Sequence, residues 1–398
     1  MALRVLHLST YGGGGGAGRA AAALNQALDK SGIDSRLVCA RGNRFKVARA
    51  ADRALRHLQS SPTQTWRSPA YFGSLSTDHI NSSDADVVNL HWVTDGFLSI
   101  KEIGRITKPI VWSMYDMWPF TGTEHYGIDT PEARWRSGYT PENRRAEESG
   151  WDLDRSTWER KKDHWSPMHM VPASSWLAEA TRASELMRSW PVTRIPHVVD
   201  DLAFAPLPRS EARQMLGLNP DTPYVVFLAS AGIGDVRKGF DLLDQSLTGV
   251  QSKLPDVELL IVGPAPMGRP AIAGVPARWL GPVSGDATLR TVYGAASVVA
   301  VPSREDNMPL TAMEAQTCGR AVVGFDIGGL PEIVRHNETG FLVPGFESDS
   351  LAAALSTAIA DSQSSDLWGQ AARERAAATW SPSAVVPQYL DIYTELAQ

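Results

Sequence analysis

Short apolar runs alternate with longer amphipathic stretches along the first half of the chain. The runs at 4–9, 35–40, 86–92 and 108–116 are typical of buried strands, and the stretch 18–32 has the apolar spacing of a helix. Strands separated by helices usually pair in parallel. The pattern therefore predicts a parallel sheet built from strand–helix–strand units.

The same alternation restarts after a connecting segment at 191–208. We expect strands at 224–230, 257–263, 277–281, 296–303 and 321–329, and helices at 239–255 and 309–319. A restart favours two sheets over one large sheet. The sequence thus predicts an α/β fold with two doubly wound Rossmann-like domains, one at residues 1–190 and the other at 191–379.

Two further segments belong to the first predicted domain. Residues 380–398 carry apolar side chains at helical spacing, so we expect a terminal helix that returns to that domain. Residues 130–165 are polar and rich in tryptophan, and they are predicted to form an irregular, partly mobile insertion. Tryptophan is frequent, with 13 in 398 residues, which suggests aromatic platforms for a ring-shaped ligand.

Composition narrows the classes of partner. The net charge is −6, which disfavours a nucleic acid partner, although the 38 Lys and Arg residues leave room for a local anion site. The chain has no long apolar run and no signal-like start, so we expect a soluble, cytoplasmic protein that acts on small molecules. Residues 158–165 mix basic residues with tryptophan at a spacing that predicts an amphipathic helix with a solvated face. The minority interpretation is contact with a membrane surface or an anionic acceptor.

Five consecutive glycines at 12–16 stand between the first strand and the first helix. A strand-to-helix turn needs one or two glycines, so five suggest a backbone that comes close to a phosphate or a sugar. Gly13, Gly15 and Gly18 also match the weak dinucleotide spacing, with Arg41 placed to suit NADP. A flexible turn without a ligand remains an alternative.

The stretch from Pro302 to Glu314 is the most informative part of the chain. An apolar strand ends at Pro302, a loop presents Asp306 and Asn307, and a helix that carries Glu314 opens near residues 310–311. Unpaired amides at a helix start attract an anion. Two acids beside an anion site point to bound hydroxyl groups, so the stretch predicts a ligand with a diphosphate and a sugar.

This stretch resembles the donor-binding signature of retaining glycosyltransferases of the GT-B fold, family 4, in which an acid, seven residues and a glutamate follow one another. "GGGGAGRAA", "GDVRKGFDLL" and "IPHVVDDLAFAP" resemble other motifs of that family. The resemblance implies two domains that face each other across a cleft. It also implies transfer of a sugar from a nucleotide diphosphate sugar to a hydroxyl, with retained configuration and without a metal or other cofactor.

The resemblance also implies which residues hold the donor. Asp306 would bind hydroxyls of the sugar, Glu314 the ribose, and Lys238, assisted by Arg237, the diphosphate. Gly15 and Gly16 would approach the diphosphate from the first domain. The remaining donor contacts would come from Asn307, Met308, Pro309, Leu310 and Thr311.

Acceptor residues are expected where two strands of the first domain end. His91 and Trp92 follow one strand, and the candidates after the next strand are Tyr115, Asp116, Trp118 and His125. We include His125 among the candidate catalytic residues, with Lys238, Asp306 and Glu314. For His91, a buried histidine of the core is nearly as good an interpretation.

The sequence departs from the family pattern at four positions. Asp306 stands where glutamate is usual, Gly232 where arginine is usual, Tyr115 where histidine is usual, and His197 where asparagine is usual. Arg237 or Arg304 would then supply a second positive charge.

Two other functions stay open at this point. A non-catalytic protein that binds nucleotide sugars would fit the substituted positions, and an NADP-dependent oxidoreductase would fit the glycine loop. Asp84 and Asp86 form a D-x-D pair, but two carboxylates without further oxygen ligands usually belong to a solvated turn. We therefore predict no metal site.

Overall fold

The structure is a computed structural model that describes residues 3–63, 65–265, 272, 274–283 and 285–398. The chain divides into two compact units. The first comprises residues 1–196 and 386–398, and the second comprises residues 197–385. The break therefore falls six residues later than the predicted one.

The first unit is built on a five-stranded parallel sheet with the order β2-β1-β4-β5-β7. Its strands are β1 (Arg4–Ser9), β2 (Asp34–Cys39), β4 (Val87–Leu90), β5 (Ile110–Met114) and β7 (His169–Pro172). Strands β4 and β5 are buried along their whole length, which explains their uninterrupted apolar sequence.

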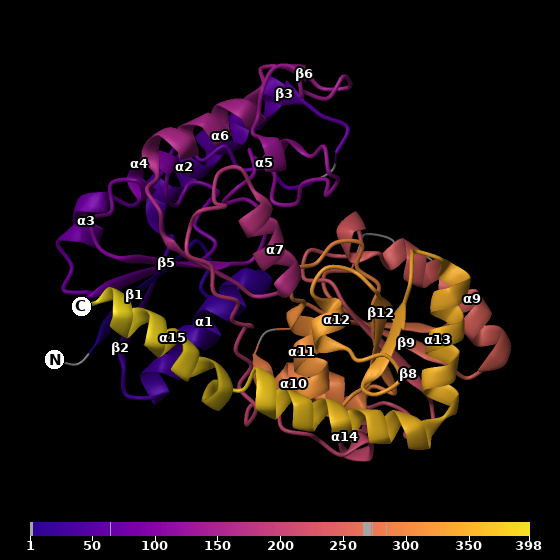
Figure 1. Ribbon diagram of the computed structural model, residues 1–398. Helices are drawn as coiled ribbons and strands as arrows, with labels where there is room; N and C mark the ends of the chain where they lie inside the picture. Colours follow the sequence, from indigo (N-terminus) through magenta and orange to yellow (C-terminus); the bar gives the residue numbers. More distant parts are fainter. Residues whose placement is uncertain (1–2, 64, 266–271, 273, 284) are drawn as a thin grey trace. The chain divides into compact units, whose positions relative to one another are not determined.

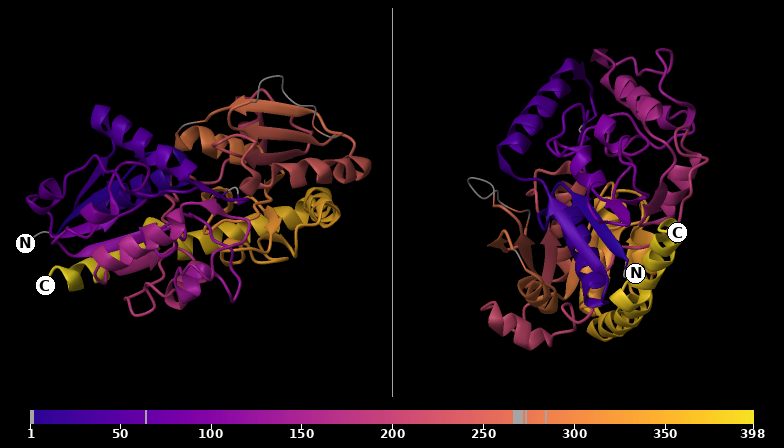
Figure 2. Two further views of the ribbon diagram at one scale, coloured as in Figure 1. Left: turned by 90° about the horizontal axis from the view of Figure 1, so that it is seen from above. Right: turned by 90° about the vertical axis from the view of Figure 1, so that its left-hand side faces the viewer.

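Helices cover both faces of this sheet (Figures 1 and 2). They are α1 (Gly15–Lys30), α2 (Gly42–Leu55), α3 (Thr77–Asn81), α4 (Ile100–Ile103), α5 (Arg134–Ser137), α6 (Leu153–His164) and α7 (Ser175–Ala183). A short helical turn, η1 (Arg56–Leu58), leads into β3 (Gln59–Ser60), which pairs with β6 (Ser149–Gly150).

The segment 130–165 is better ordered than its polar sequence suggested. It contains α5, β6 and α6, and three of its four tryptophans, Trp135, Trp158 and Trp165, are at most 7% exposed, whereas Trp151 is 47% exposed. The three buried tryptophans pack in the core of the first unit with Trp112. Most tryptophans of this segment thus belong to the hydrophobic core. This corrects the expectation that they form exposed platforms for a ring-shaped ligand.

The second unit repeats the architecture with a six-stranded parallel sheet in the order β10-β9-β8-β11-β12-β13. The strands are β8 (Tyr224–Leu228), β9 (Glu258–Val262), β10 (Ala277–Gly281), β11 (Val298–Val301), β12 (Val322–Phe325) and β13 (Gly340–Val343). Two layers of helices enclose the sheet, with α9 (Phe240–Lys253) and α13 (Ser348–Ala360) on one face (Figure 1).

The other helical elements of the second unit complete the two layers. They are α8 (Arg209–Met215), η2 (Val236–Lys238), α10 (Asp286–Ala295), α11 (Leu310–Thr317), α12 (Leu330–Ile333) and α14 (Ser362–Thr379). Both sheets match the predicted pair of doubly wound, Rossmann-like halves.

The last helix, α15 (Pro382–Leu396), packs its final turns on the first unit. The Tyr389 hydroxyl is 3.0 Å from Ser113 Oγ on β5, and Asn89 on β4 donates to the Tyr393 hydroxyl. All four of these residues are at most 4% exposed. These buried polar contacts confirm that the terminal helix returns to the first unit, as its apolar spacing predicted.

Candidate functional site

An ion pair joins the end of η2 to the loop that follows β11 in the second unit. Lys238 Nζ lies 2.6 Å from Asp306 Oδ2, and Arg237 Nη1 lies 3.6 Å from the same oxygen. Ser303 Oγ donates to it as well, at 3.4 Å. All three contacts use Oδ2, so Oδ1 can accept a hydrogen bond from a ligand hydroxyl.

The charges around Asp306 keep this carboxylate ionised. Burial raises its pKa, but the attraction of Lys238 and Arg237 outweighs burial and sets the pKa below its ordinary value. Arg304 is engaged elsewhere, because its guanidinium binds both oxygens of Asp241 at 2.6–2.7 Å. Of the two arginines considered as a second cation, Arg237 is therefore the one beside Asp306.

Two glycines let backbone segments close around this loop. Gly239 has φ +68°, and a Cβ there would lie 1.8 Å from the carbonyl oxygen of Pro302. Gly328 has φ +53°, and a Cβ there would lie 2.0 Å from the carbonyl oxygen of Asp306. Since any side chain would clash with backbone at both places, these glycines fix the position of Asp306 and of the start of α11.

Glu314 lies inside α11 and is only 2% exposed. The hydroxyl of Tyr293, on α10, donates to its Oε2 at 2.8 Å. At the start of the same helix, Leu310 and Thr311 are half-buried, and their amides precede the first intrahelical hydrogen bonds. The helix thus offers an anion-binding end and, one turn further, a buried carboxylate.

Three of the predicted acceptor residues form one cluster in the first unit. Trp92 Nε1 donates to Asp116 Oδ2 at 3.0 Å, and His125 Nδ1 lies 2.6 Å from the same oxygen. The other ring nitrogen of His125 is 2.8 Å from Ser68 Oγ, and its ring stacks on Trp92. Because both ring nitrogens are occupied, His125 orients Asp116 in this structure, and direct contact with a substrate would require breaking one of these bonds.

His91 and Tyr115 belong to a second chain of polar contacts, in which His7 and His91 are almost fully buried and Tyr115 is half-buried. His91 Nδ1 lies 2.8 Å from the Tyr115 hydroxyl, and His91 Nε2 lies 2.8 Å from His7 Nδ1. His91 is 1% exposed. The structure therefore supports the interpretation of His91 as a core histidine over an acceptor contact, because its two nitrogens face protein groups.

Trp118 is also part of the interior, at 2% exposure, and its indole donates to the carbonyl of Ser68. Its ring lies 3.9 Å from the ammonium of Lys161, which is fully buried. That ammonium donates to the carbonyls of Trp118, Thr121 and Gly122. Lys161 therefore holds the loop between Asp116 and His125, whereas the sequence predicted a solvated helix face.

A signal for this buried lysine was present in the sequence. Lys161 comes three residues after Trp158 and four before Trp165, so all three share one face of a helix. The polar composition of the segment hid that pattern.

The glycine loop requires its glycines at particular positions. Gly13 has φ +137° and Gly15 has φ +67°, and a Cβ added at either would meet no described atom within 4 Å. Gly16 already lies in α1 without a positive φ. Positions 13 and 15 therefore need glycine because of their backbone conformation. Gly16 has no such need, and there is open space where its side chain would be.

The D-x-D carboxylates have other partners. Asp86 binds the backbone amide and the guanidinium of Arg4, and Asp84 pairs with Arg36. Within the described part of the chain, no group of three or more His, Cys, Asp or Glu side chains is arranged to hold a metal. In the same part, no helix is both long and apolar enough to cross a membrane.

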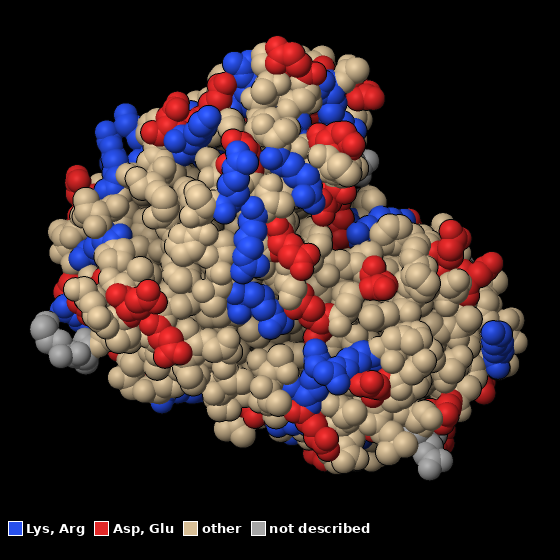
Figure 3. Space-filling view, viewed as in Figure 1, with Lys and Arg blue, Asp and Glu red and all other residues tan. Residues whose placement is uncertain are grey.

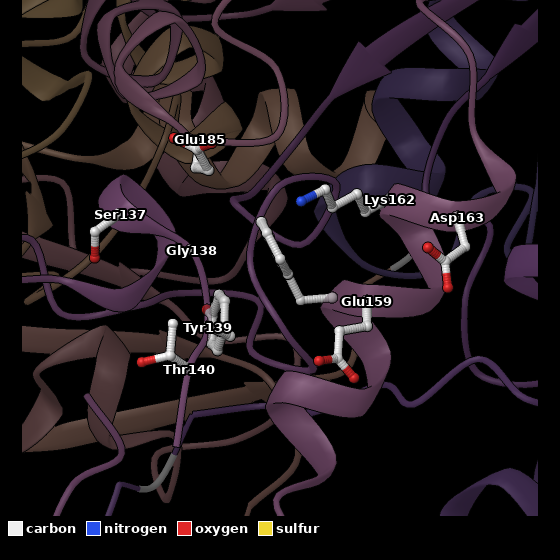
Figure 4. A pocket seen from close by; sticks show the side chains of 9 residues that line it. Ser137, Gly138, Tyr139, Thr140, Glu159, Lys162, Asp163 and Glu185 are labelled. Atoms are coloured by element: carbon white, nitrogen blue, oxygen red, sulfur yellow. The ribbon is translucent and has the colours of Figure 1, made fainter. Parts of the chain in front are cut away.

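One open pocket of about 520 Å³ lies in the first unit. Glu159, Lys162 and Asp163 reach it from α6, and the segment 137–140 lies opposite them (Figure 4). None of the predicted donor or acceptor residues lines it. The aromatic residues that do, Tyr139 and Trp158, are almost fully buried and offer little surface to a ligand.

Comparison with known proteins identifies the second unit most directly. The family described as "Glycosyl transferases group 1" matches residues 222–361, which include Lys238, Asp306 and Glu314. A D-inositol 3-phosphate glycosyltransferase of Actinosynnema mirum is 39% identical over 178 residues, which are 41% of this chain and 42% of the relative. A protein of the same name from Rhodococcus erythropolis is 35% identical over 225 residues, 52% and 50% of the two chains. The chain thus spans about half the length of the curated relatives that it matches.

Solved structures match the whole chain. A sucrose-phosphate synthase from Thermosynechococcus elongatus aligns with a TM-score of 0.69 at 19% identity, over 99% of both chains. HepE of Anabaena, in complex with UDP-glucose, aligns with a TM-score of 0.65 at 17% identity, over 99% of this chain and all of that one. Identities this low show the fold alone. Together, the comparisons show that residues 222–361 are similar to the glycosyl transferases group 1 family and that the chain has the two Rossmann-like halves of the GT-B fold.

Proposed function

We propose that this protein transfers a sugar from a nucleotide diphosphate sugar to a hydroxyl of a small molecule, a natural product or a polysaccharide precursor. The anomeric configuration would be retained, and no metal would be needed. The observation that carries the proposal is the joint presence, in the family-matched segment, of the Lys238–Asp306 pair, the start of α11 and the buried Glu314. UDP-sugars are the donors that we favour, because the aligned HepE structures contain UDP or UDP-glucose.

Each part of the site has a role in this proposal. Lys238 and the first amides of α11 stabilise the negative charge that develops on the leaving diphosphate. Asp306 accepts from hydroxyls of the donor sugar through Oδ1, and Glu314 accepts from the ribose. An oxygen of the leaving phosphate takes the proton of the attacking hydroxyl, so the mechanism requires no dedicated protein base.

The first unit supplies the acceptor side. Asp116 is held by Trp92 and His125, and it is the one carboxylate of that cluster, with 7% of its surface exposed. The curated relatives are named for D-inositol 3-phosphate, a polyol that carries a phosphate. We propose that a hydroxyl-bearing acceptor binds near Asp116.

A panel of nucleotide sugars tests the proposal. The purified protein is incubated with UDP-, GDP- and ADP-sugars, and release of the nucleoside diphosphate is followed with and without chelator. Turnover, or slow hydrolysis of one donor that survives the chelator, is the expected result. Tight binding of a nucleotide sugar without turnover would make the protein a binding relative, and binding of NADP alone would overturn the proposal.

A further inference from the structure

Three arginines of the first unit converge on one buried carboxylate. Arg53 binds both oxygens of Asp95 at 2.8 Å, Arg56 Nη2 lies 3.0 Å from Oδ1, and Arg49 Nε lies 2.9 Å from Oδ2. The Tyr11 hydroxyl donates to Oδ2 at 2.9 Å. Arg49 and Arg53 extend from α2 and Arg56 from η1, so residues of one continuous segment surround Asp95.

The positive charge in this cluster exceeds the negative charge. Asp95 is fully buried, whereas the arginine side chains are 20–37% exposed. Asp52 also attracts Arg56, while it accepts from the amides of Ala70 and Tyr71. Three guanidinium groups therefore face two carboxylates.

Like charges held this close repel one another, and a bound anion relieves that repulsion. Each guanidinium presents five N–H donors, and the contacts with Asp95 use only one or two from each arginine. Solvent reaches the arginines but not Asp95. The cluster therefore has both spare donors and excess charge on its accessible side.

An aromatic ring borders the same arginines. Trp66 is 46% exposed, and the guanidinium carbons of Arg56 and Arg53 lie 4.5 and 5.4 Å from its ring centroid. An exposed indole next to cations suits a ligand that has an apolar ring face and an anionic substituent. The arginines alone would bind such a ligand and a free anion alike, so Trp66 is the group that would favour a ligand with a ring.

Two connections lead from the cluster to the proposed acceptor residues. Tyr11, which binds Asp95, stacks on Trp92 at a centroid distance of 5.6 Å. The carbonyl of Trp66 accepts from the backbone amide of His125 at 2.9 Å. The cluster is thus adjacent to the Trp92–His125 pair that holds Asp116.

On the face shown in Figure 3, Lys and Arg side chains gather in a stripe over the first unit, with Asp and Glu side chains beside it. Helix α2 lies toward the far side of the first unit in this view (Figures 1 and 2), so the stripe is a separate feature and the inference rests on the contacts of the cluster itself.

We propose that Arg49, Arg53 and Arg56, with Trp66, form a subsite for a phosphate group carried by a ring-shaped acceptor. The inference rests on the proposed glycosyl transfer and adds the class of acceptor. A soluble phosphorylated sugar or polyol and a phospholipid headgroup share this chemistry, and the experiment distinguishes them.

Binding is measured without turnover, so that it does not depend on the transfer reaction. Calorimetry compares glucose 6-phosphate, inositol 3-phosphate, their unphosphorylated forms and inorganic phosphate, and sedimentation tests vesicles of phosphatidylglycerol. The expected result is binding of at least one phosphorylated ring that its neutral form does not show. Binding to vesicles only would assign the subsite to a headgroup, and equal, weak binding of every anion would overturn the proposal.

Variants locate the binding on the cluster. Arg53→Gln and Arg56→Gln should each weaken binding of the phosphorylated ring by about tenfold or more, the usual effect of losing a charge-assisted hydrogen bond. Arg44→Gln and Lys46→Gln remove the same charge from exposed positions of α2 and serve as controls. If the control variants weakened binding of the phosphorylated ring as much as the cluster variants do, the effect would come from net charge alone. That result would overturn the subsite.

Two further measurements separate other causes. UDP affinity should be unchanged in every variant, since Lys238, Asp306 and Glu314 lie in the second unit. Absence of UDP binding by the wild-type protein would overturn the proposed function but not the anion subsite. Asp95→Asn, checked for folding by its melting temperature, removes a negative charge and should keep or strengthen phosphate binding. A folded Asp95→Asn protein that binds the phosphorylated ring less well would contradict the subsite.

Discussion

Lys238 Nζ and Asp306 Oδ2 form a 2.6 Å ion pair, so the cation that we propose for the leaving diphosphate contacts the acid that we propose for the donor sugar. Lys238→Ala should lower turnover by about 10²–10³-fold, the usual loss for one electrostatic stabiliser of a transition state. Affinity for the nucleoside diphosphate should fall less. Steady-state kinetics and calorimetry measure the two effects, and Lys253→Ala, at an exposed position of α9, is the control. Equal losses in both measurements would contradict a role at the transition state.

Asp306→Asn separates sugar recognition from nucleotide recognition. The substitution keeps the shape of the side chain but removes the charge that faces Lys238. We expect nearly unchanged affinity for the nucleoside diphosphate alone and a clear loss of turnover with the complete donor. A variant that loses nucleotide affinity and turnover together would show that Asp306 serves the diphosphate instead.

Glu314→Gln should weaken nucleotide binding by ~1.5–3 kcal/mol, because ribose hydroxyls would lose a charged acceptor. The structural part of the effect is separable, since the Tyr293 hydroxyl holds Glu314 Oε2. Tyr293→Phe removes that internal bond and leaves the carboxylate in place. Calorimetry with UDP on both variants decides the matter: a similar loss in each would mean that Glu314 acts by supporting α10 and α11.

The glycine loop gives a pair of substitutions with different outcomes. Gly15→Ala places a side chain at φ +67° and should destabilise the protein by ~1 kcal/mol. Gly16→Ala should leave the melting temperature unchanged, because the added Cβ meets no described atom within 4 Å. Gly16→Val then tests the donor contact, and a folded variant with wild-type turnover would show that no donor approaches this residue.

His7 gives a pH prediction. Burial lowers the pKa of its ring to about 3, against 6.5 in an unfolded chain. Below pH 6.5 the unfolded state therefore binds a proton that the folded state does not, so stability falls as the pH drops toward 3 by ~1.4 kcal/mol per pH unit. A ¹H–¹⁵N NMR titration should show a neutral His7 ring at pH 5. Protonation of this ring near pH 6 would contradict its buried environment.

Lys161→Met tests the three hydrogen bonds that Lys161 donates to carbonyls of the loop between Asp116 and His125. The variant leaves the carbonyls of Trp118, Thr121 and Gly122 without a donor, at a cost of ~1–3 kcal/mol for each that stays unpaired. A large fall in the melting temperature is expected. Lys162→Met is the matched control, because the neighbouring side chain is exposed, and a fall of equal size there would contradict the role of these hydrogen bonds.

Local pattern was enough to predict the two sheets. Strands such as β4 and β5 are buried on both faces, so their sequences are apolar throughout and stand out from the helices between them. The candidate donor residues Asp306 and Glu314 could also be proposed from sequence, because they lie eight residues apart on one loop and one helix, and their binding role stays a prediction. Their spacing alone marks the pair, although contacts distant in the sequence, such as that of Lys238 with Asp306, fix their positions.

Long-range contacts explain what the sequence did not reveal. Asp95 and Arg53 are 42 residues apart, and Lys161 and Trp118 are 43 residues apart. Nothing in the local pattern marks either pair, and a charged side chain is ordinarily assigned to the surface. The burial of His91 and of most tryptophans in 130–165 likewise depends on neighbours from other elements, which periodicity along one segment cannot supply.

The contacts of Tyr389 and Tyr393 with β5 and β4 have a consequence for synthesis on the ribosome. Residues 1–196 leave the ribosome early, yet the polar groups of Ser113 and Asn89 are covered only by a helix made after residues 197–385. During translation, Ser113 and Asn89 on this face of the nascent sheet therefore stay exposed to solvent until α15 has been synthesised and packs on them. A nascent chain halted before Tyr389 should be cut by protease within the first unit, whereas the released protein should resist.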